Sequence, residues 1–189
     1  LDTADDTSSA HAWVSMSQSN VKADGEFTGI YTYDNHVVLF KKDFMQLVYN
    51  NKNPFRIVDV GAYGADNPYA IAEANGVLYF ASSDGVYAFG GGTPKLVSTS
   101  LGLQNFTGAV LGGYKDTLYA QIGNTLYRLR NGTWSGSTPA HNVKQFASND
   151  NGLYGLLENG DIVMIRSADA DNIDTDSSDT TFDPDDYGD

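Results

Sequence analysis

The sequence predicts an all-β protein, a β-propeller-like array of about four four-stranded blades. A two-hairpin phrase recurs along the chain, with Tyr79, Tyr119 and Tyr154 at equivalent places, 40 and then 35 residues apart. Each copy consists of short apolar runs separated by turn residues such as Asn-Gly and Asp-Gly, which is typical of β-hairpins. No segment shows helical periodicity over about ten residues. Repeats of this length built only from short strands are typical of propeller blades.

The copies place the blades at about residues 26–60, 69–98, 106–137 and 143–166. The expected strands are Phe27–Tyr33, Val37–Lys41, Phe44–Tyr49 and Arg56–Val60; Tyr69–Ala74, Val77–Ala81, Val86–Phe89 and Lys95–Ser98; Phe106–Leu111, Thr117–Ile122, Thr125–Arg130 and a strand at Trp134; then Val143–Ala147, Leu153–Leu157 and Ile162–Arg166. The second strand of each blade has the apolar run of a strand covered on both faces, and the outer strands are more polar.

Composition divides the chain into three parts. Residues 1–23 form a polar lead-in with one candidate strand, residues 24–167 form the propeller-type domain, and residues 168–189 form an acidic tail. The tail contains nine Asp and no base, so we expect a disordered, flexible linker. The last blade lacks its fourth strand and the chain begins at Leu1. We therefore expect the array to be part of a larger propeller, completed by further chain or by neighbouring subunits.

Charge and apolar content exclude several classes of function. The formal net charge is −13, and an acidic surface repels phosphate backbones, so direct nucleic-acid binding is disfavoured. There is no cysteine, and hence no disulfide framework or thiolate metal site. No apolar run reaches the length of about 18 residues that a membrane helix needs. The sequence also lacks a signal-peptide pattern.

The residue types that carry catalysis show no productive spacing. The three histidines, His11, His36 and His141, are not spaced as paired metal ligands, and we expect His36 on the surface in a hairpin turn. No G-x-S-x-G nucleophile elbow occurs. Gly90–Gly92 lacks the Lys-Ser/Thr or helix of a phosphate loop, and is expected to be a wide turn. The sequence therefore predicts no enzyme, and no catalytic, cofactor-binding or metal-binding residue.

Three weaker patterns suit calcium binding, glycosylation or sugar binding. Asp169–Asp176 is similar to a calcium loop, but the EF-hand positions for Gly and Glu hold Asp174 and Thr180. Whether this strip binds calcium stays open, with a solubilising linker as the default. The sequons at Asn105 and Asn131 are interpreted as chance occurrences. Trp13 and Trp134 are aromatics that would suit a sugar platform, although packing in a blade core or between blades is the favoured use.

An ordered set of phrases between Asp24 and about Ser98 resembles a family of bacteriophage virion proteins. These are the β-propeller tail components of short-tailed phages, of the nozzle, tubular or packaged-DNA stabilisation type. The matching phrases are Asp24–Ile30, Val37–Lys41, Phe44–Tyr49, Phe55–Val58, Asn75–Phe80 and Asp84–Phe89. The segment Gly61–Ala65 departs from the family pattern, which is a Gly-Cys segment leading to a Pro. This chain keeps only Gly64 and Pro68 of that pattern. The later blades match by general shape alone.

The resemblance implies a structural component of a phage tail or head–tail connection. Such a protein forms a ring with other copies of itself and contacts neighbouring tail, connector or fibre proteins. It is located in the virion, after assembly in the host cytoplasm, and DNA passes nearby without specific binding. The alternative is a carbohydrate- or cell-surface-binding propeller. A propeller hydrolase or lyase would need a cluster of carboxylates, histidines or a metal at the central channel, which the sequence does not show.

Overall fold

Two-residue turns rich in Asn, Asp and Gly fold the chain into consecutive hairpins. Asp34 and Asn35 both have positive φ, at 46° and 59°, and Asn75 and Gly76 follow at 51° and 69°. Positive φ at both central residues is the geometry that matches the right-handed twist of two adjoining strands. These residue types tolerate that backbone conformation, so the hairpins form locally.

The computed structural model describes residues 26–49 and 56–168. Blade 1 consists of β1 (Phe27–Tyr33), β2 (His36–Lys41), β3 (Phe44–Tyr49) and β4 (Arg56–Gly61). Blade 2 consists of β5 (Ile71–Ala74), β6 (Val77–Ser82), β7 (Gly85–Phe89) and β8 (Lys95–Leu96). A 3₁₀ turn, η1 (Thr99–Leu101), leads to blade 3, which consists of β9 (Val110–Tyr114), β10 (Thr117–Ile122), β11 (Thr125–Arg130) and β12 (Thr133–Ser137). Blade 4 consists of β13 (Val143–Asn149), β14 (Gly152–Leu157) and β15 (Ile162–Ser167).

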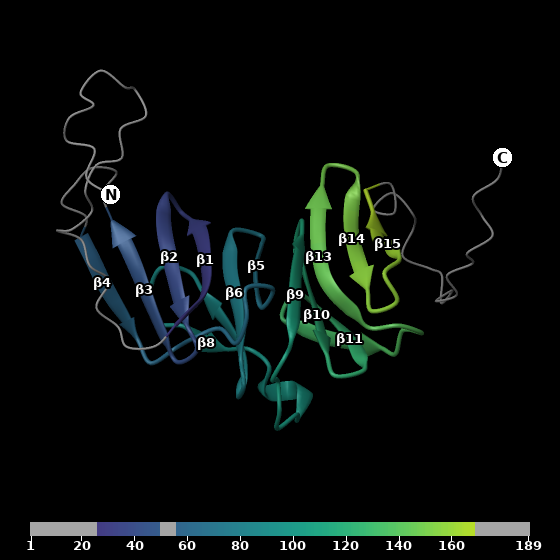
Figure 1. Ribbon diagram of the computed structural model, residues 1–189, viewed down its shortest axis with the longest axis horizontal. Coiled ribbons are helices and arrows are strands. Elements are labelled where there is room, and N and C mark those ends of the chain that lie inside the picture. Colours follow the sequence, from purple (N-terminus) through teal and green to yellow (C-terminus); the bar gives the residue numbers. More distant parts are fainter. Residues whose placement is uncertain (1–25, 50–55, 169–189) are drawn as a thin grey trace, which may run out of the picture.

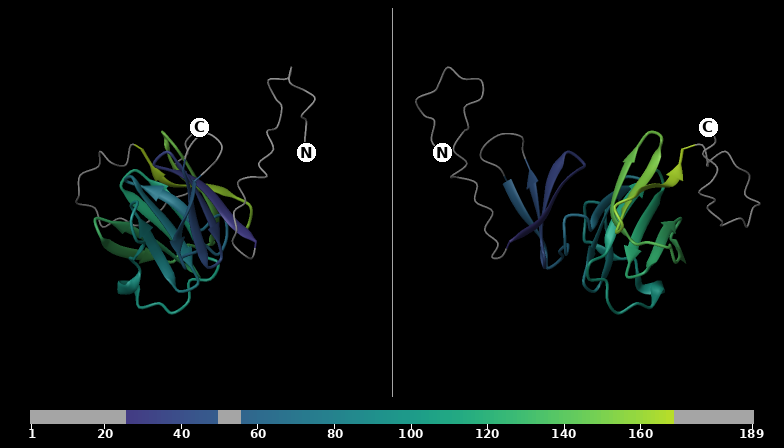
Figure 2. Two further views of the ribbon diagram at one scale, coloured as in Figure 1. Left: turned by 90° about the vertical axis from the view of Figure 1, so that its left-hand side faces the viewer. Right: turned by 45° about the vertical axis from the view of Figure 1, so that its right-hand side comes forward.

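The four antiparallel sheets stand side by side in chain order as an open fan (Figure 1). Within each sheet the strands follow one another in sequence, from the first strand to the last. The first strands of the four blades converge. One cavity of about 190 Å³ is lined by residues from all four of these strands: Tyr31 of β1, Glu73 of β5, Gly112 of β9 and Ala147 of β13. A turned view shows blades 1 and 4 at the two outer sides of the fan (Figure 2). The fold is thus a β-propeller-like array around a common axis.

Each blade has two faces, which we name from the chain direction. The leading face lies toward the preceding blade and the trailing face lies toward the following one. In blade 2, Leu78 and Phe80 belong to the leading face, and Tyr79 and Ala81 belong to the trailing face, as the alternation of a strand requires. The central strand is therefore covered on both sides, which explains its continuous apolar sequence.

Three apolar seams join the blades. The seam between blades 1 and 2 buries Val38, Phe40 and Met45 against Phe80 and Phe89. The seam between blades 2 and 3 is of similar size, with buried residues that are mostly small: Ala70, Ala72, Ala74, Ala81, Val86, Phe106, Ala109, Leu111, Leu118, Ala120, Ile122 and Leu129. The seam between blades 3 and 4 contains only three buried members, Tyr114, Tyr119 and Leu153, within the described residues.

Hydrogen bonds from the connections fix each blade to the one before it. The Ala65 amide donates to Lys41 O at 3.1 Å, and the Phe106 amide donates to Ser83 O at 3.0 Å. At the third seam a side chain takes this role, since the Val143 amide donates to Gln121 Oε1 at 3.3 Å. The blades therefore follow one repeated docking scheme, with a polar variation at the last seam.

The structure confirms the all-β array and its order of strands, and it corrects some details. The first strand of blade 3 begins at Val110, not at Phe106, because Phe106 is a buried loop residue that closes the seam. His36 is the first residue of β2, half-buried against the Tyr49 ring, and not an exposed turn residue. Among the described residues, blade 4 has three strands. The lead-in (1–23) and the acidic tail from residue 169 onward lie outside the described residues.

Candidate functional site

The leading face of blade 1 carries a group of apolar side chains and has no blade against it in the described chain. Pairing of β1 with β2 and of β2 with β3 puts four apolar side chains on this face: Ile30, Val37, Leu39 and Val48. Their counterparts in blade 2, counted from the shared hairpin turns, are Ile71, Leu78, Phe80 and Phe89, all of which are buried. Ile30 is instead 71 % exposed. Positions that are packed inside the fan are thus open at its first end.

The trailing face of blade 4 is the corresponding surface at the other end. The register of β14 with β15 places Tyr154 opposite Met164, and Leu156 opposite Ile162. Leu156 is 37 % exposed and Ile162 is 73 % exposed. Tyr154 occupies the position that Tyr79 and Tyr119 hold in the seams. Within residues 26–49 and 56–168, the fan therefore ends in one leading face and one trailing face that no further blade covers.

A polar row crosses the trailing face of blade 3, where the other blades are apolar. Register places Arg128 between Tyr119 and Ser135, and Arg130 between Thr117 and Thr133. The counterparts of Arg128 in blades 1 and 2 are Leu47 and Ala88, which are apolar. Arg128 thus stands at a repeat position where blade 1 packs Leu47 into its seam, and Arg130 lies beside it on the same face.

These arginines line a cavity of about 250 Å³ between blades 3 and 4. Blade 4 contributes Arg166 of β15, and the β9–β10 turn contributes Lys115 and Asp116. Four of the eleven Lys and Arg side chains of an acidic chain therefore line one cavity. Tyr114 also lines it, and its hydroxyl is buried without a hydrogen-bond partner among the described residues. We call these residues the basic cavity.

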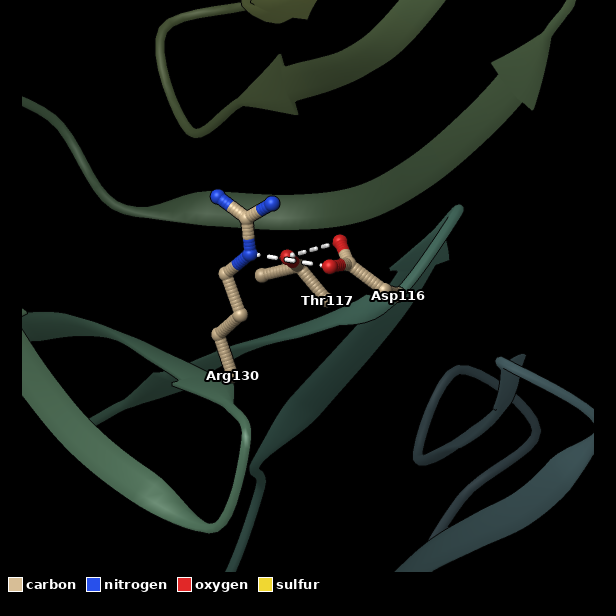
Figure 3. Close-up of polar contacts among 3 residues, drawn as sticks. All are labelled: Asp116, Thr117 and Arg130. Atoms are coloured by element: carbon tan, nitrogen blue, oxygen red, sulfur yellow. Dashed lines mark hydrogen bonds and ion pairs between the residues drawn. The ribbon is translucent and has the colours of Figure 1, made fainter. Parts of the chain in front are cut away.

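One carboxylate organises the wall of the basic cavity (Figure 3). Arg130 Nε donates to Asp116 Oδ2 at 2.9 Å, and the Thr117 hydroxyl donates to Asp116 Oδ1 at 3.0 Å. Desolvation raises the pKa of Asp116, but the hydrogen bonds from Thr117 and Arg130 and the charge of Arg130 outweigh it, so this pKa is lowered. Arg128 Nε donates to Ser135 Oγ at 2.7 Å. The wall is held as a hydrogen-bonded, net positive surface.

A second polar contact lies at the β6–β7 turn of blade 2. The Tyr87 hydroxyl donates to Asp84 Oδ2 at 2.7 Å. Burial, the hydrogen bond to Asp84 and the negative charge of Asp84 raise the pKa of Tyr87 to about 12. Its ring stacks on Phe80 and meets Tyr63 edge-on, so this tyrosine is a neutral packing residue at neutral pH.

The remaining residues singled out in the sequence do not meet in one place. His141 is exposed between β12 and β13, and Gly90–Gly92 form the turn from β7 to β8, as expected. Trp134 donates its indole N–H to Val97 O at 2.8 Å and packs on the seam between blades 2 and 3. It is thus used for packing between blades. His11, Trp13 and the Asp-rich strip lie outside the described residues.

The described part of the chain has neither a cluster of metal ligands nor a membrane-spanning helix. No three His, Cys, Asp or Glu side chains within residues 26–49 and 56–168 lie close enough together to hold a metal ion. Over the same ranges, no helix has the length and apolar character needed to cross a membrane.

Sequence reasoning missed the basic cavity because its members are distant in the chain. Arg166 is far from Arg128 and Arg130 in sequence, and only the stacking of blades 3 and 4 brings them to one cavity. A signal was present, however. Aligning the repeats by their hairpin turns places Arg128 beside the apolar Leu47 and Ala88. A charged residue at a position that the repeat keeps apolar indicates a local function.

Comparison with known proteins supports the fold alone. No protein-family model matches the chain, and no curated protein matches it. A similar solved structure is described as the crystal structure of the computationally designed Ika4 protein. It is 14 % identical in sequence with a TM-score of 0.55, and the match covers 79 % of this chain and 96 % of that one.

Proposed function

We propose that this protein is a non-enzymatic structural module that assembles by blade-to-blade contacts into a ring, as a component of a phage virion tail or head–tail connection. The observation that carries the proposal is the pair of uncovered apolar faces at the two ends of the fan. At each inner seam, a trailing face packs on a leading face. The described chain offers one further face of each kind.

The occupant that we propose for each end face is a second copy of this chain. The uncovered leading face carries Ile30 and Leu39 where the inner blades bury Ile71 and Phe80, and the uncovered trailing face carries Tyr154 where they bury Tyr119. A face-to-face contact between different surfaces of identical chains closes into a ring when the rotation between copies permits it. The closed assembly then contains a multiple of four blades.

The assignment to a virion rests on the ordered phrases of the first two blades. These phrases fall on consecutive strands, with Val37–Lys41 on β2, Phe44–Tyr49 on β3, and Asn75–Phe80 and Asp84–Phe89 across the hairpin of β6 and β7. Together with the acidic composition, which leaves few charges to neutralise DNA phosphates, they support a place near a DNA conduit. Portal, terminase or tail-fibre genes next to the coding sequence would test this assignment directly.

Substitution at the end faces tests assembly. Ile30→Glu and Leu156→Glu each put a charge on an exposed apolar position, so the fold of the single chain is kept while burial of that face becomes costly. Light scattering after size exclusion should give multiples of 20.4 kDa for the original chain and 20.4 kDa for either variant. Leu96→Glu is the matched control, because Leu96 is exposed on β8 away from both end faces.

Two results would contradict the proposal. The first is a single-chain mass for the original protein at concentrations of about 100 μM, where contacts of micromolar affinity are occupied. The second is loss of assembly in Leu96→Glu to the same degree as in the end-face variants. A monomer whose melting temperature rises with a glycan would favour the carbohydrate-binding alternative instead.

A further inference from the structure

We propose that the basic cavity between blades 3 and 4 is a binding site for a phosphate-type oxyanion. It combines Arg128, Arg130 and Arg166 from two blades with Lys115 at the rim, around a volume of about 250 Å³. Guanidinium groups bind the oxygens of phosphate and carboxylate through paired, charge-assisted hydrogen bonds. Anion binding in this cavity does not depend on ring formation.

The composition of this seam argues against a purely structural use of the cavity. Leu47 of blade 1 packs into its seam, and the equivalent Arg128 of blade 3 is exposed to the cavity. The seam between blades 3 and 4 consequently has a smaller buried cluster than the other two. Replacing apolar packing with clustered like charges costs stability, and an anion bound between them offsets that repulsion.

The hydrogen-bonding capacity of the wall also fits an anion. Asp116 accepts from Arg130 Nε and from Thr117, which fixes the side chain of Arg130 at the cavity. Arg128 uses its Nε for Ser135, which orients its guanidinium group on the same wall. The buried Tyr114 hydroxyl is a donor without a partner among the described residues. An oxyanion within the cavity supplies acceptors for such donors.

Volume and charge restrict the ligand class. A cavity of about 250 Å³ has room for a single phosphate or carboxylate group with its hydration water, or for the end of a longer anion. Among the described lining residues there is one acid, Asp116, against four bases. This net positive lining favours a group with at least one negative charge over a neutral sugar.

Two sources supply such a group. One is free phosphate, or a phosphate group of another molecule, from outside the chain. The other is the chain itself, because the nine Asp of residues 169–189 begin three positions after Arg166 and are present at high effective concentration. Both present negatively charged oxygens to the arginines, and removal of the chain's own carboxylates distinguishes them.

The test is titration of the full chain with inorganic phosphate at low ionic strength, followed by NMR of the backbone amides and the arginine Nε–H signals. We expect saturable shifts at Arg128, Arg130 and Arg166. Arg128→Gln should weaken phosphate binding about tenfold or more, the loss of one charge-assisted contact. Tyr114→Phe should weaken it to a smaller extent. Lys144→Gln is the control: it removes the same charge from exposed Lys144 of β13, outside the cavity, and should leave the affinity unchanged.

A fourth variant, with Asp169, Asp171, Asp174 and Asp176 each changed to Asn, identifies the source of the anion. If the chain's own carboxylates occupy the cavity, this variant binds phosphate more tightly than the original chain and shifts the Arg128 signal before phosphate is added. If the anion comes from outside, its affinity equals that of the original chain. The proposal is overturned if neither protein shows saturable shifts at the three arginines, or if Arg128→Gln and Lys144→Gln weaken binding equally.

Discussion

Gly113 lies on β9, where the first strand of blade 3 runs against the first strand of blade 2. A Cβ atom at Gly113 would overlap the carbonyl group of Glu73 on β5. The two backbones are tied nearby, since the Leu111 amide donates to Tyr69 O and the Asn75 amide donates to Lys115 O, each at 2.8 Å. A single hydrogen atom as side chain is therefore what allows the inner strands to converge on the axis.

We expect Gly113→Ala to destabilise the protein by about 2–3 kcal/mol, toward the upper end of the cost of overpacking, because the obstructing atoms belong to backbone and cannot turn aside. Gly90→Ala is the control, since a Cβ atom there meets nothing within 4 Å and the residue does not have a positive φ. Urea unfolding of both variants measures the difference. Equal stabilities would show that β5 and β9 are farther apart in solution.

At the scale of elements, the seams differ in the forces that hold them. The first two seams rely on apolar burial, and the third adds a buried amide in place of apolar area. Gln121 of β10 stands where blades 1 and 2 have Phe40 and Ala81 on their trailing faces. Its Nε2 donates to Gly123 O at 2.9 Å and to Asn142 Oδ1 at 3.1 Å. Blade 4 is thereby fixed to blade 3 through the segment just before β13.

We predict that Gln121→Met costs about 2 kcal/mol, because it keeps the volume but leaves the buried Val143 amide without its acceptor. Hydrogen exchange should locate the effect, with faster exchange in β13 and little change in β2 or β3. Gln104→Met, at an exposed loop position, makes the same replacement without burial and should be neutral within about 0.5 kcal/mol. Uniformly faster exchange across all blades would contradict a local role.

The difference between local and long-range contacts explains how far the sequence predicts the structure. Hairpin turns and alternation are local, so the period that relates Tyr79 to Tyr119 and Tyr154 is sufficient to predict the blades and their order. The two faces of each strand are also readable in the sequence. Local sequence does not show which faces meet. The basic cavity depends on such a meeting, because Arg166 of blade 4 and Arg128 of blade 3 line it together. Phe106 was misassigned for a related reason: an apolar loop residue that fills a seam resembles the start of a strand.

For the whole molecule, the open fan makes stability a function of concentration. If end faces pack on other copies, each association event buries apolar surface that the single chain exposes, and the folded state is stabilised by mass action.

We therefore expect the melting temperature of the original chain to rise as protein concentration increases. Leu156→Glu removes the contact without touching the inner seams, so its melting temperature should not depend on concentration and should match that of the original chain at high dilution. Differential scanning calorimetry over a hundredfold range of concentration measures both curves. A melting temperature that stays constant for the original chain would mean that the end faces of Ile30 and Leu156 are not covered by other copies, and that the apolar positions of the repeat are tolerated in water.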